Sequence, residues 1–81
     1  MDVTGRAHDR SIDTSGLFCP LPIIRTADAM RGMAIDTVLE VIATDFGILE
    51  DMPAWCTATG NEYLGTDAER GVYRSYVRRR R

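Results

Sequence analysis

Residues 37–43 read Thr-Val-Leu-Glu-Val-Ile-Ala, a β-branched and almost continuously apolar run. A run of this kind predicts a central strand that is covered on at least one face of its sheet. A helical pattern over 23–33 comes before it, and a shorter strand pattern over 11–15 comes before that helix. A helix between two strands predicts a parallel pair joined by a right-handed crossover. Since 81 residues suffice for one domain only, the rest of the chain must complete this same sheet.

The second half of the chain supplies another helix and a hairpin. Apolar residues from Ile48 recur at helical spacing up to Gly60, a residue suited to ending a helix. Pro53 lies inside this run, and we expect it to kink or restart the helix. Two strands, 62–65 and 72–77, flank a polar turn. The predicted fold class is α/β, a two-layer sandwich of order β-α-β-α-β-β, in which a four-stranded mixed sheet carries two helices on one face.

Charge is distributed unevenly along the chain. Ten basic residues, all arginine, stand against twelve acidic ones, and the net charge is −2. Four of the arginines form the run 78–81, so the remaining six face twelve acids, a balance of −6. An acidic body does not fit a nucleic-acid-binding domain, because such domains carry a basic face. We expect residues 1–10 to be a flexible tail, 11–78 to be the single domain and 79–81 to be a basic tail.

The sequence contains no run of about 20 apolar residues and no basic leader followed by an apolar stretch. We therefore expect a protein that is neither inserted in a membrane nor exported. Its two cysteines, Cys19 and Cys56, are far apart and lack metal-ligand spacing, as is typical of a reducing cytoplasm. We expect a cytoplasmic monomer without metal or cofactor, in which His8 is a solvated tail residue.

A short motif around Cys19, Leu-Phe-Cys-Pro-Leu-Pro, leads into the first helix. Proline lacks an N–H and has a nearly helical φ, so Pro20 fits the first helical position and Pro22 the first turn. This places Cys19 at the N-cap, with Leu21 and Ile23 as the free N–H donors near its sulfur. Such donors and the helix dipole favour an anion, and they predict an activated thiol with a lowered pKa. The alternative interpretation is a small buried cysteine that precedes a helix.

The motif lacks the second cysteine of a dithiol oxidoreductase. In Cys-x-x-Cys the resolving cysteine stands three positions after the first, and here that position is Pro22. A thiol without a local partner suits a carrier that holds sulfur as a persulfide until an acceptor arrives. We expect Cys56, on the apolar stripe of the second helix, to be a buried structural thiol. We expect Leu17 and Phe18 to anchor the motif to the core.

Three segments of the sequence resemble the TusA/SirA-type sulfurtransferases, whose mark is Cys-Pro-x-Pro after a short strand with an Asp and a Gly. That mark corresponds to residues 12–22 here. The family's Ala-x-Asp stretch and its Asp-x-Pro-(Ala/Gly)-aromatic-Cys stretch correspond to 43–45 and 51–56, and a closing Tyr-Arg-x-x-aliphatic-Arg strand corresponds to 73–78. The resemblance covers about residues 11 to 78 and implies the same two-layer α/β fold.

The resemblance also implies a function. A protein of this kind accepts sulfane sulfur as a persulfide on Cys19, from a donor of the rhodanese or cysteine desulfurase type, and passes it to an acceptor protein of a sulfur relay. It implies that Asp13, Gly16 and Asp45 orient the loops near Cys19, although capping and turn roles are the simpler explanation of these residues. The alternative function is a non-catalytic regulatory or protein-binding module of SirA type.

Two positions depart from the tRNA-thiolation members of the family. The residue between the prolines, often acidic in those members, is Leu21. The residue before Asp-x-Pro, commonly basic in those members, is Glu50. Both differences alter the charge near the expected docking surface. The sequence therefore leaves the pathway open among tRNA thiolation, sulfur oxidation and cofactor assembly.

Overall fold

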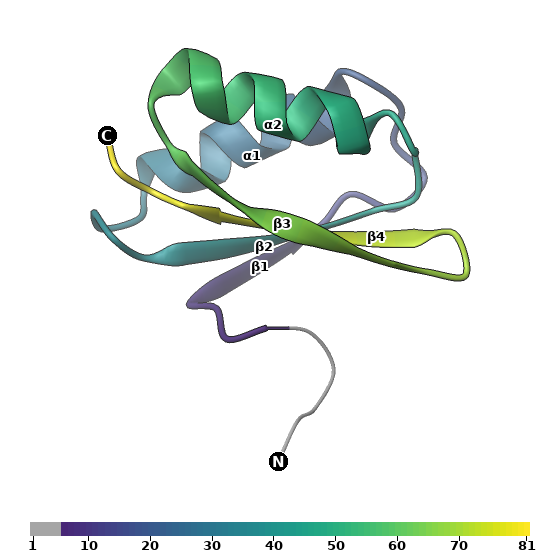
Figure 1. Cartoon of the computed structure of the whole chain (residues 1–81), viewed down its shortest axis with the longest axis horizontal. Helices are drawn as coiled ribbons and strands as arrows, with labels where there is room; N and C mark the ends of the chain where they lie inside the picture. Colours follow the sequence, from purple (N-terminus) through teal and green to yellow (C-terminus); the bar gives the residue numbers. More distant parts are fainter. Residues whose placement is uncertain (1–5) are drawn as a thin grey trace.

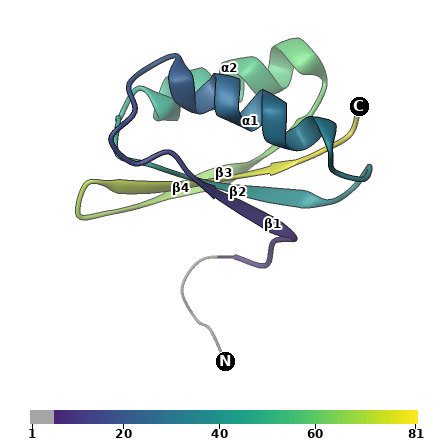
Figure 2. The same cartoon turned by 180° about the vertical axis from the view of Figure 1, so that it is seen from behind.

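A four-stranded sheet carries both helices on one face in the computed structural model, which describes residues 6–81 (Figure 1). The view from behind shows the same two layers, with α1 in front of α2 (Figure 2). The order of elements is the predicted β-α-β-α-β-β. The elements are β1 (Arg10–Asp13), α1 (Leu21–Arg31), β2 (Val38–Ala43), α2 (Ile48–Thr59), β3 (Glu62–Glu69) and β4 (Val72–Arg78).

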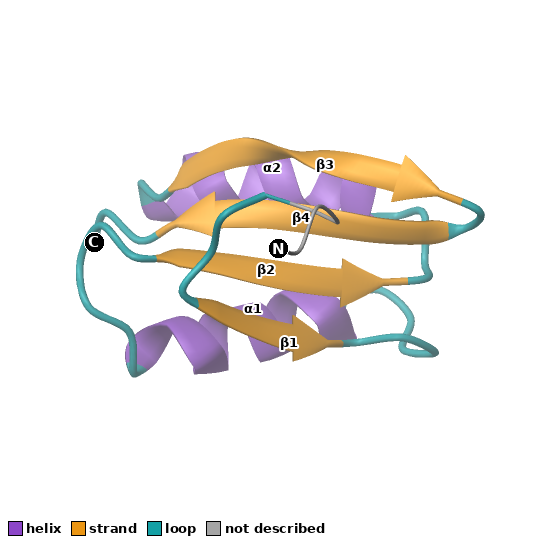
Figure 3. Cartoon of the chain, turned by 90° about the horizontal axis from the view of Figure 1, so that it is seen from below, coloured by secondary structure: helices purple, strands orange, loops and turns teal. Residues whose placement is uncertain are grey.

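The strands lie in the order β1-β2-β4-β3 (Figure 3). β1 and β2 run parallel, with Ile12 opposite Val41, and α1 makes the connection between them. β4 pairs antiparallel with both β2 and β3. The apolar run that predicts a central strand thus lies inside the sheet, where neighbours on both sides satisfy its backbone N–H and C=O groups.

The core lies between the helices and one face of the sheet. Leu39 of β2 and Val77 of β4 stand opposite each other on this face, and both are fully buried. Met30 of α1 and Met52 of α2 belong to the same cluster. Burial of a side chain of this size stabilises the fold by roughly 1.5–3 kcal/mol. This packing fixes both helices over the sheet, and with them the loops at the helix ends.

The opposite face of the sheet is polar around one buried acid, Glu40. Its carboxylate accepts hydrogen bonds from the hydroxyls of Ser11 (2.8 Å) and Tyr76 (2.7 Å). Burial, and then the hydrogen bond to Glu40, raise the pKa of the Tyr76 hydroxyl. The polar group is therefore buried with its hydrogen bonds made, as a stable interior requires.

The segment that precedes β1 crosses this polar face (Figure 3). The Arg6 guanidinium lies 5.3 Å from the centroid of the Tyr76 ring, and it also donates to Asp67. His8 Nε2 lies 3.7 Å from a Glu40 oxygen. The prediction of a flexible tail is therefore wrong for residues 6–10, because cation–π and ionic contacts to distant residues hold them. The rest of that predicted tail, 1–5, lies outside the described residues.

Arg79 joins the C-terminus to the body of the domain. Its backbone N–H donates to the Thr37 carbonyl, and its carbonyl accepts from the Asp36 N–H, so chain pairing continues past β4. Its guanidinium donates to the carbonyls of Arg31 and Met33, where α1 ends. A cation is favourable at this end of a helix, because the last carbonyls lack helical partners.

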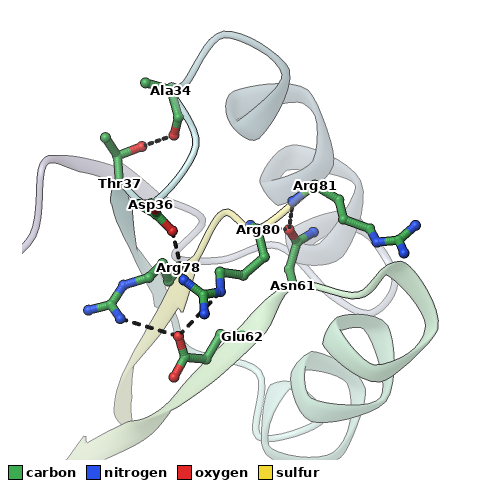
Figure 4. A network of polar contacts seen from close by, with 8 residues as sticks. All are labelled: Ala34, Asp36, Thr37, Asn61, Glu62, Arg78, Arg80 and Arg81. Atoms are coloured by element: carbon green, nitrogen blue, oxygen red, sulfur yellow. Dashed lines mark hydrogen bonds and ion pairs between the residues drawn. The ribbon is translucent and has the colours of Figure 1, made fainter.

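The neighbouring arginines are paired as well (Figure 4). Arg78 pairs with Glu62 (3.3 Å) and Arg80 with Asp36 (2.7 Å). Asn61 Oδ1 accepts the backbone N–H groups of residues 80 and 81. The prediction of a separate basic tail at 79–81 is therefore wrong, since nearby carboxylates, an amide and helix-end carbonyls bind this run.

β3 is four residues longer than the sequence pattern predicts. The hairpin turn consists of Arg70 and Gly71, both with positive φ (53° and 79°), so strand pairing continues up to a two-residue turn. A register shift between Tyr63 and Gly65, with Gly65 at φ 123°, forms a bulge in β3. Residues 67–69 are exposed at the end of the sheet, although they are still paired with β4.

α2 is one helix that includes Pro53, so the proline does not restart it. It ends as predicted at Gly60, which has φ 79° and donates its N–H to the Cys56 carbonyl. This left-handed conformation favours glycine because it has no Cβ. Within residues 6–81, neither helix is long and apolar enough to cross a membrane.

Candidate functional site

Cys19 lies exposed in the loop between β1 and α1. α1 begins at Leu21, so Pro20 and not Cys19 occupies the N-cap position. The Leu21 N–H donates to the Phe18 carbonyl (2.8 Å), and the Ile23 N–H donates to the Pro20 carbonyl (3.1 Å). The prediction of two free N–H groups beside the sulfur is therefore wrong, because local turn hydrogen bonds use both of them.

The two prolines begin the helix one residue later than predicted. Pro22 is buried in the first turn, and its carbonyl accepts a hydrogen bond from Thr26 Oγ1 (2.8 Å). The Cys19–Pro20 peptide bond is cis. Because a proline in the first turn has no N–H that needs a partner, the helix begins here without a capping side chain.

The Cys19 thiol contacts a carboxylate in the first turn of α2. It donates to Asp51 Oδ2, and the sulfur and oxygen lie 2.6 Å apart. A thiolate and a carboxylate would repel each other strongly at this distance, so the contact favours the protonated form of the thiol. This hydrogen bond raises the pKa of the Cys19 thiol, and desolvation and the charges of Asp51 and Asp45 raise it further. The lowered pKa predicted from the helix dipole is wrong for the unbound protein.

Asp45 joins the Cys19 loop to the start of α2. Its Oδ2 accepts the Cys19 backbone N–H (2.8 Å), and its Oδ1 accepts the Gly47 N–H (3.2 Å). Gly47 is the N-cap of α2, and no side chain caps this helix. Asp45 thus holds the backbone of both loops, and it is not the helix cap that its position in the sequence predicts.

Asp13 and Gly16 shape the first half of the Cys19 loop. Hydrogen bonds from the Ser15 hydroxyl and from its N–H lower the pKa of Asp13. Gly16 has φ 82° and donates its N–H to Thr44 Oγ1 (2.9 Å) at the end of β2. Both residues therefore act on the course of the loop.

Cys56 differs from Cys19 in its exposure to solvent. It lies on α2 in the core, with 2% of its surface exposed, and burial raises the pKa of its thiol to about 11. The prediction of a buried thiol at this position is confirmed. A buried, protonated thiol is inert, and Cys19 is the accessible one.

Exposed apolar side chains lie on the segment that carries Cys19 and on the segment that contacts it. Phe18 and Phe46 are 74% and 73% exposed, so the prediction that Phe18 anchors the motif to the core is wrong. Phe46 adjoins Asp45, whose carboxylate holds the Cys19 N–H. We call this surface the Cys19 face and define it by Phe18, Cys19, Leu21, Ile24, Asp45, Phe46, Leu49, Glu50 and Asp51.

Asp51 is the site residue that reasoning from the sequence missed. Its position was visible, since it opens the Asp-x-Pro segment. Its role was not, because the contact with Cys19 joins residues 32 positions apart. The indication in the sequence was an acid at the start of one predicted helix and a cysteine at the start of the other.

The fold and this site define a class: a small two-layer α/β protein that exposes one cysteine where its first helix begins. A family model described as Sulfurtransferase TusA matches residues 10–79. The chain belongs to this family.

Two relatives and one solved structure are similar to this chain. The sulfur carrier protein TusA of Pseudomonas entomophila is 37% identical over 78 residues, which are 96% of this chain and 98% of that one. YrkF of Bacillus subtilis is 44% identical over 68 residues, which are 84% of this chain. The chain spans just over a third (37%) of the length of YrkF. The crystal structure of the SirA-like protein from Desulfitobacterium hafniense shares the fold, with a TM-score of 0.73 at 22% identity over 90% of this chain and 100% of that one.

Proposed function

We propose that this protein is a sulfur carrier, which accepts sulfane sulfur as a persulfide on Cys19 and passes it to an acceptor protein in a sulfur relay. Membership in the TusA family supports this function. The observation that carries it is the position of Cys19, an exposed thiol on a loop with an open apolar surface around it. The proposed donor is a persulfide-bearing protein of the rhodanese or cysteine desulfurase type.

Each transfer is a thiol exchange that balances without an external oxidant. In loading, the Cys19 thiolate attacks the terminal sulfur of the donor's persulfide. A new S–S bond forms on Cys19, the donor's S–S bond breaks, and its electron pair leaves on the donor's cysteine sulfur. In delivery, an acceptor thiolate attacks the terminal sulfur on Cys19, and Cys19 departs as a thiolate. A proton leaves Cys19 before loading and returns to it after delivery.

The separation of the two cysteines supports a carrier over a redox enzyme. A second thiol within reach would attack the persulfide and form an internal disulfide. Cys56 is buried in the core, away from that chemistry. A persulfide on Cys19 is therefore stable until an acceptor protein docks.

Intact-protein mass spectrometry tests the proposal. The wild type, Cys19→Ser and Cys56→Ser are incubated with a persulfidated rhodanese or cysteine desulfurase, and circular dichroism checks that each variant is folded. We expect the wild type and Cys56→Ser to gain one sulfur atom and Cys19→Ser to gain none. Equal uptake by Cys19→Ser, or no uptake by the wild type from either donor, overturns the carrier and leaves the non-catalytic binding module.

We further propose that the carrier works as a monomer in a reducing cytoplasm. Cys19 has to return to a free thiol between transfers, and reducing compartments maintain free thiols. Direct binding of nucleic acid is not part of the proposal, because neighbouring carboxylates already pair with arginines of the run 78–81. Leu21 and Glu50 leave the relay pathway open.

A further inference from the structure

We propose that the Cys19 face binds its partner through a cationic side chain that pairs with Asp51, and that this pairing frees the Cys19 thiol to react. The partner is a protein surface that presents an arginine or lysine within an apolar patch. The identity of that partner as a sulfur donor or acceptor rests on the proposed function. The charge preference itself belongs to this chain and is measurable on the protein alone.

The Cys19 face is acidic and has no cation of its own. The segments that form it, 17–24 and 44–55, contain three charged residues, all acidic: Asp45, Glu50 and Asp51. The next charged residue along α1, Arg25, lines a separate hollow beside β1 together with Asp13 and Asp28. A cation that neutralises the face must therefore come from another molecule.

Several acids elsewhere in the described chain have arginine partners, whereas Asp9, Asp13 and Glu69 have none. Asp28 pairs with Arg31, and Asp36, Glu62 and Asp67 pair with arginines from the two ends of the chain. Within residues 6–81, no arginine lies within ion-pair distance of Asp45, Glu50 or Asp51. Two of these three acids contact Cys19, so their charge at this face is complementary to that of a cationic partner.

A partner's cation at Asp51 changes the chemistry of Cys19 directly. Asp51 Oδ2 is the acceptor of the thiol proton, and its charge opposes the thiolate. A guanidinium or ammonium on this carboxylate offsets the charge and competes for the same oxygen. An opposite charge within about 4–6 Å favours the ionised form of a group, so the thiolate becomes accessible in the complex. Docking by the wrong partner leaves a protonated, poorly nucleophilic thiol.

The apolar part of the face strengthens this effect. Phe18 and Phe46 are each almost three-quarters exposed and carry no polar group that water would have to satisfy. A partner that covers them removes water from the surroundings of Asp51 and Cys19. Charge interactions grow as the local dielectric constant falls, so the same ion pair acts more strongly in the complex than in free solution.

Charged disulfides test the proposal without any partner protein. The probes are cystamine, which is cationic, bis(2-hydroxyethyl) disulfide, which is neutral, and dithiodiglycolate, which is anionic. In each reaction the Cys19 thiolate attacks one disulfide sulfur, and the other leaves as a thiolate. Rates are followed by intact mass in the Cys56→Ser background at low salt. We expect cystamine to react fastest and the anionic reagent slowest, with a preference that weakens as salt is added.

Substitutions assign the preference to Asp51. In Asp51→Asn we expect the cationic-to-anionic rate ratio to fall by about fivefold or more, the effect of a unit charge pair about 4 Å apart in water. The neutral reagent should react faster at a given pH, with its pH–rate profile moved to lower pH. Asp28→Asn, which removes an exposed acid outside the Cys19 face, should leave all three rates unchanged.

Two results would overturn the proposal: equal rates for the three reagents in the starting protein, or an unchanged ratio in folded Asp51→Asn. Glu50→Gln, at an exposed position of the same face, should lower the ratio by a smaller factor, and it decides the matter if Asp51→Asn does not fold. These rates do not depend on sulfur uptake from a donor. The charge preference and the carrier function can therefore fail separately.

Discussion

The two ends of the helical layer carry opposite chemistry. At the amino ends of α1 and α2 lie Cys19 and three acids that have no arginine beside them. At the carboxyl ends, where the chain terminates in Figure 1, lies an arginine run whose carboxylate and carbonyl partners come from the same chain. The helix dipoles favour both arrangements, since Glu50 and Asp51 lie in the first turn of α2 and Arg31 lies in the last turn of α1. The difference is that the arginines pair with groups of the same chain, while the acids at the Cys19 end have no arginine partner and can pair with a cation of another molecule.

The two thiols also lie at opposite ends of the helical layer. Cys19 is exposed at the amino end, and its reactivity depends on what approaches Asp51. Cys56 is buried one turn before Gly60, and its carbonyl accepts the N–H groups that end α2. Changes at the arginine end should therefore alter the free energy of unfolding, and changes at the Cys19 end should alter reactivity.

The largest expected effect on stability comes from high pH acting on Cys56. Its thiol has a pKa of about 11 in the folded protein against an ordinary value of 9.0. Below pH 9 the thiol is neutral in both states and stability is unaffected. Between pH 9 and 11 only the unfolded chain ionises, so the free energy of unfolding should fall by about 2 kcal/mol. Urea unfolding at intervals across this range measures it.

Two variants isolate that contribution. Cys56→Ser should lack the part of the fall in the free energy of unfolding that the Cys56 thiol causes. The fall that remains should include a contribution from Tyr76, whose pKa is also raised. Cys19→Ser should keep most of the fall, because the Cys19 side chain is exposed. An identical dependence on pH in the wild type and Cys56→Ser would show that the buried thiol does not carry the effect.

A matched pair of glycines gives the next largest effect. Gly60 ends α2 with φ 79°, so Gly60→Ala should lower the free energy of unfolding by about 1–2 kcal/mol. Gly47 begins the same helix with φ −56°, and an added Cβ there meets only the Asp45 side chain at an ordinary distance of 3.5 Å. Gly47→Ala should change stability by no more than about 0.5 kcal/mol. Thermal unfolding of both variants makes the comparison, and equal losses would contradict it.

The fold was largely predictable because its signals are local. The apolar run of β2 and the helical stripes on either side of it set the order of elements, and Gly60 marked the end of α2. What the sequence did not reveal depends on distant partners. Arg6 lies against Tyr76, 70 residues away, and Arg80 pairs with Asp36, so neither end is the free tail that its composition predicts.

The site was predictable in position and not in chemistry. The motif and the resemblance both selected Cys19, and Asp45 does lie beside it. The expected activation of the thiol rested on free N–H groups and the helix dipole, which are fractional charges. A full carboxylate charge in contact with the sulfur outweighs them, and that carboxylate comes from the other helix. A single sequence does not show which charged side chains of different helices and strands come into contact.

A smaller effect is expected from Asn61, which holds the last residues of the chain. Its Oδ1 accepts the backbone N–H groups of residues 80 and 81 (2.9 and 3.2 Å). Asn61→Ala removes both hydrogen bonds at a partly exposed position, so the free energy of unfolding should fall by about 1 kcal/mol. Urea unfolding measures this loss, and the reaction of Cys19 with neutral disulfide is the control. A changed rate at Cys19 would contradict the separation of the two ends.

The smallest effect on stability, and the sharpest test of the comparison, is expected at Phe18. Its side chain is 74% exposed, so Phe18→Ser should shift the free energy of unfolding by no more than about 0.5 kcal/mol. If the Cys19 face is covered by a sulfur donor, the same change removes apolar contact area and should slow the loading of Cys19 from that donor. Ile35→Ser is the matched control, because Ile35 is 54% exposed in the loop after α1, at the arginine end. It should alter neither quantity. Equal loading rates in both variants would mean that the exposed apolar residues beside Cys19 do not take part in docking. A loss of stability in Phe18→Ser alone would mean that this apolar surface stabilises the fold and is not reserved for a partner.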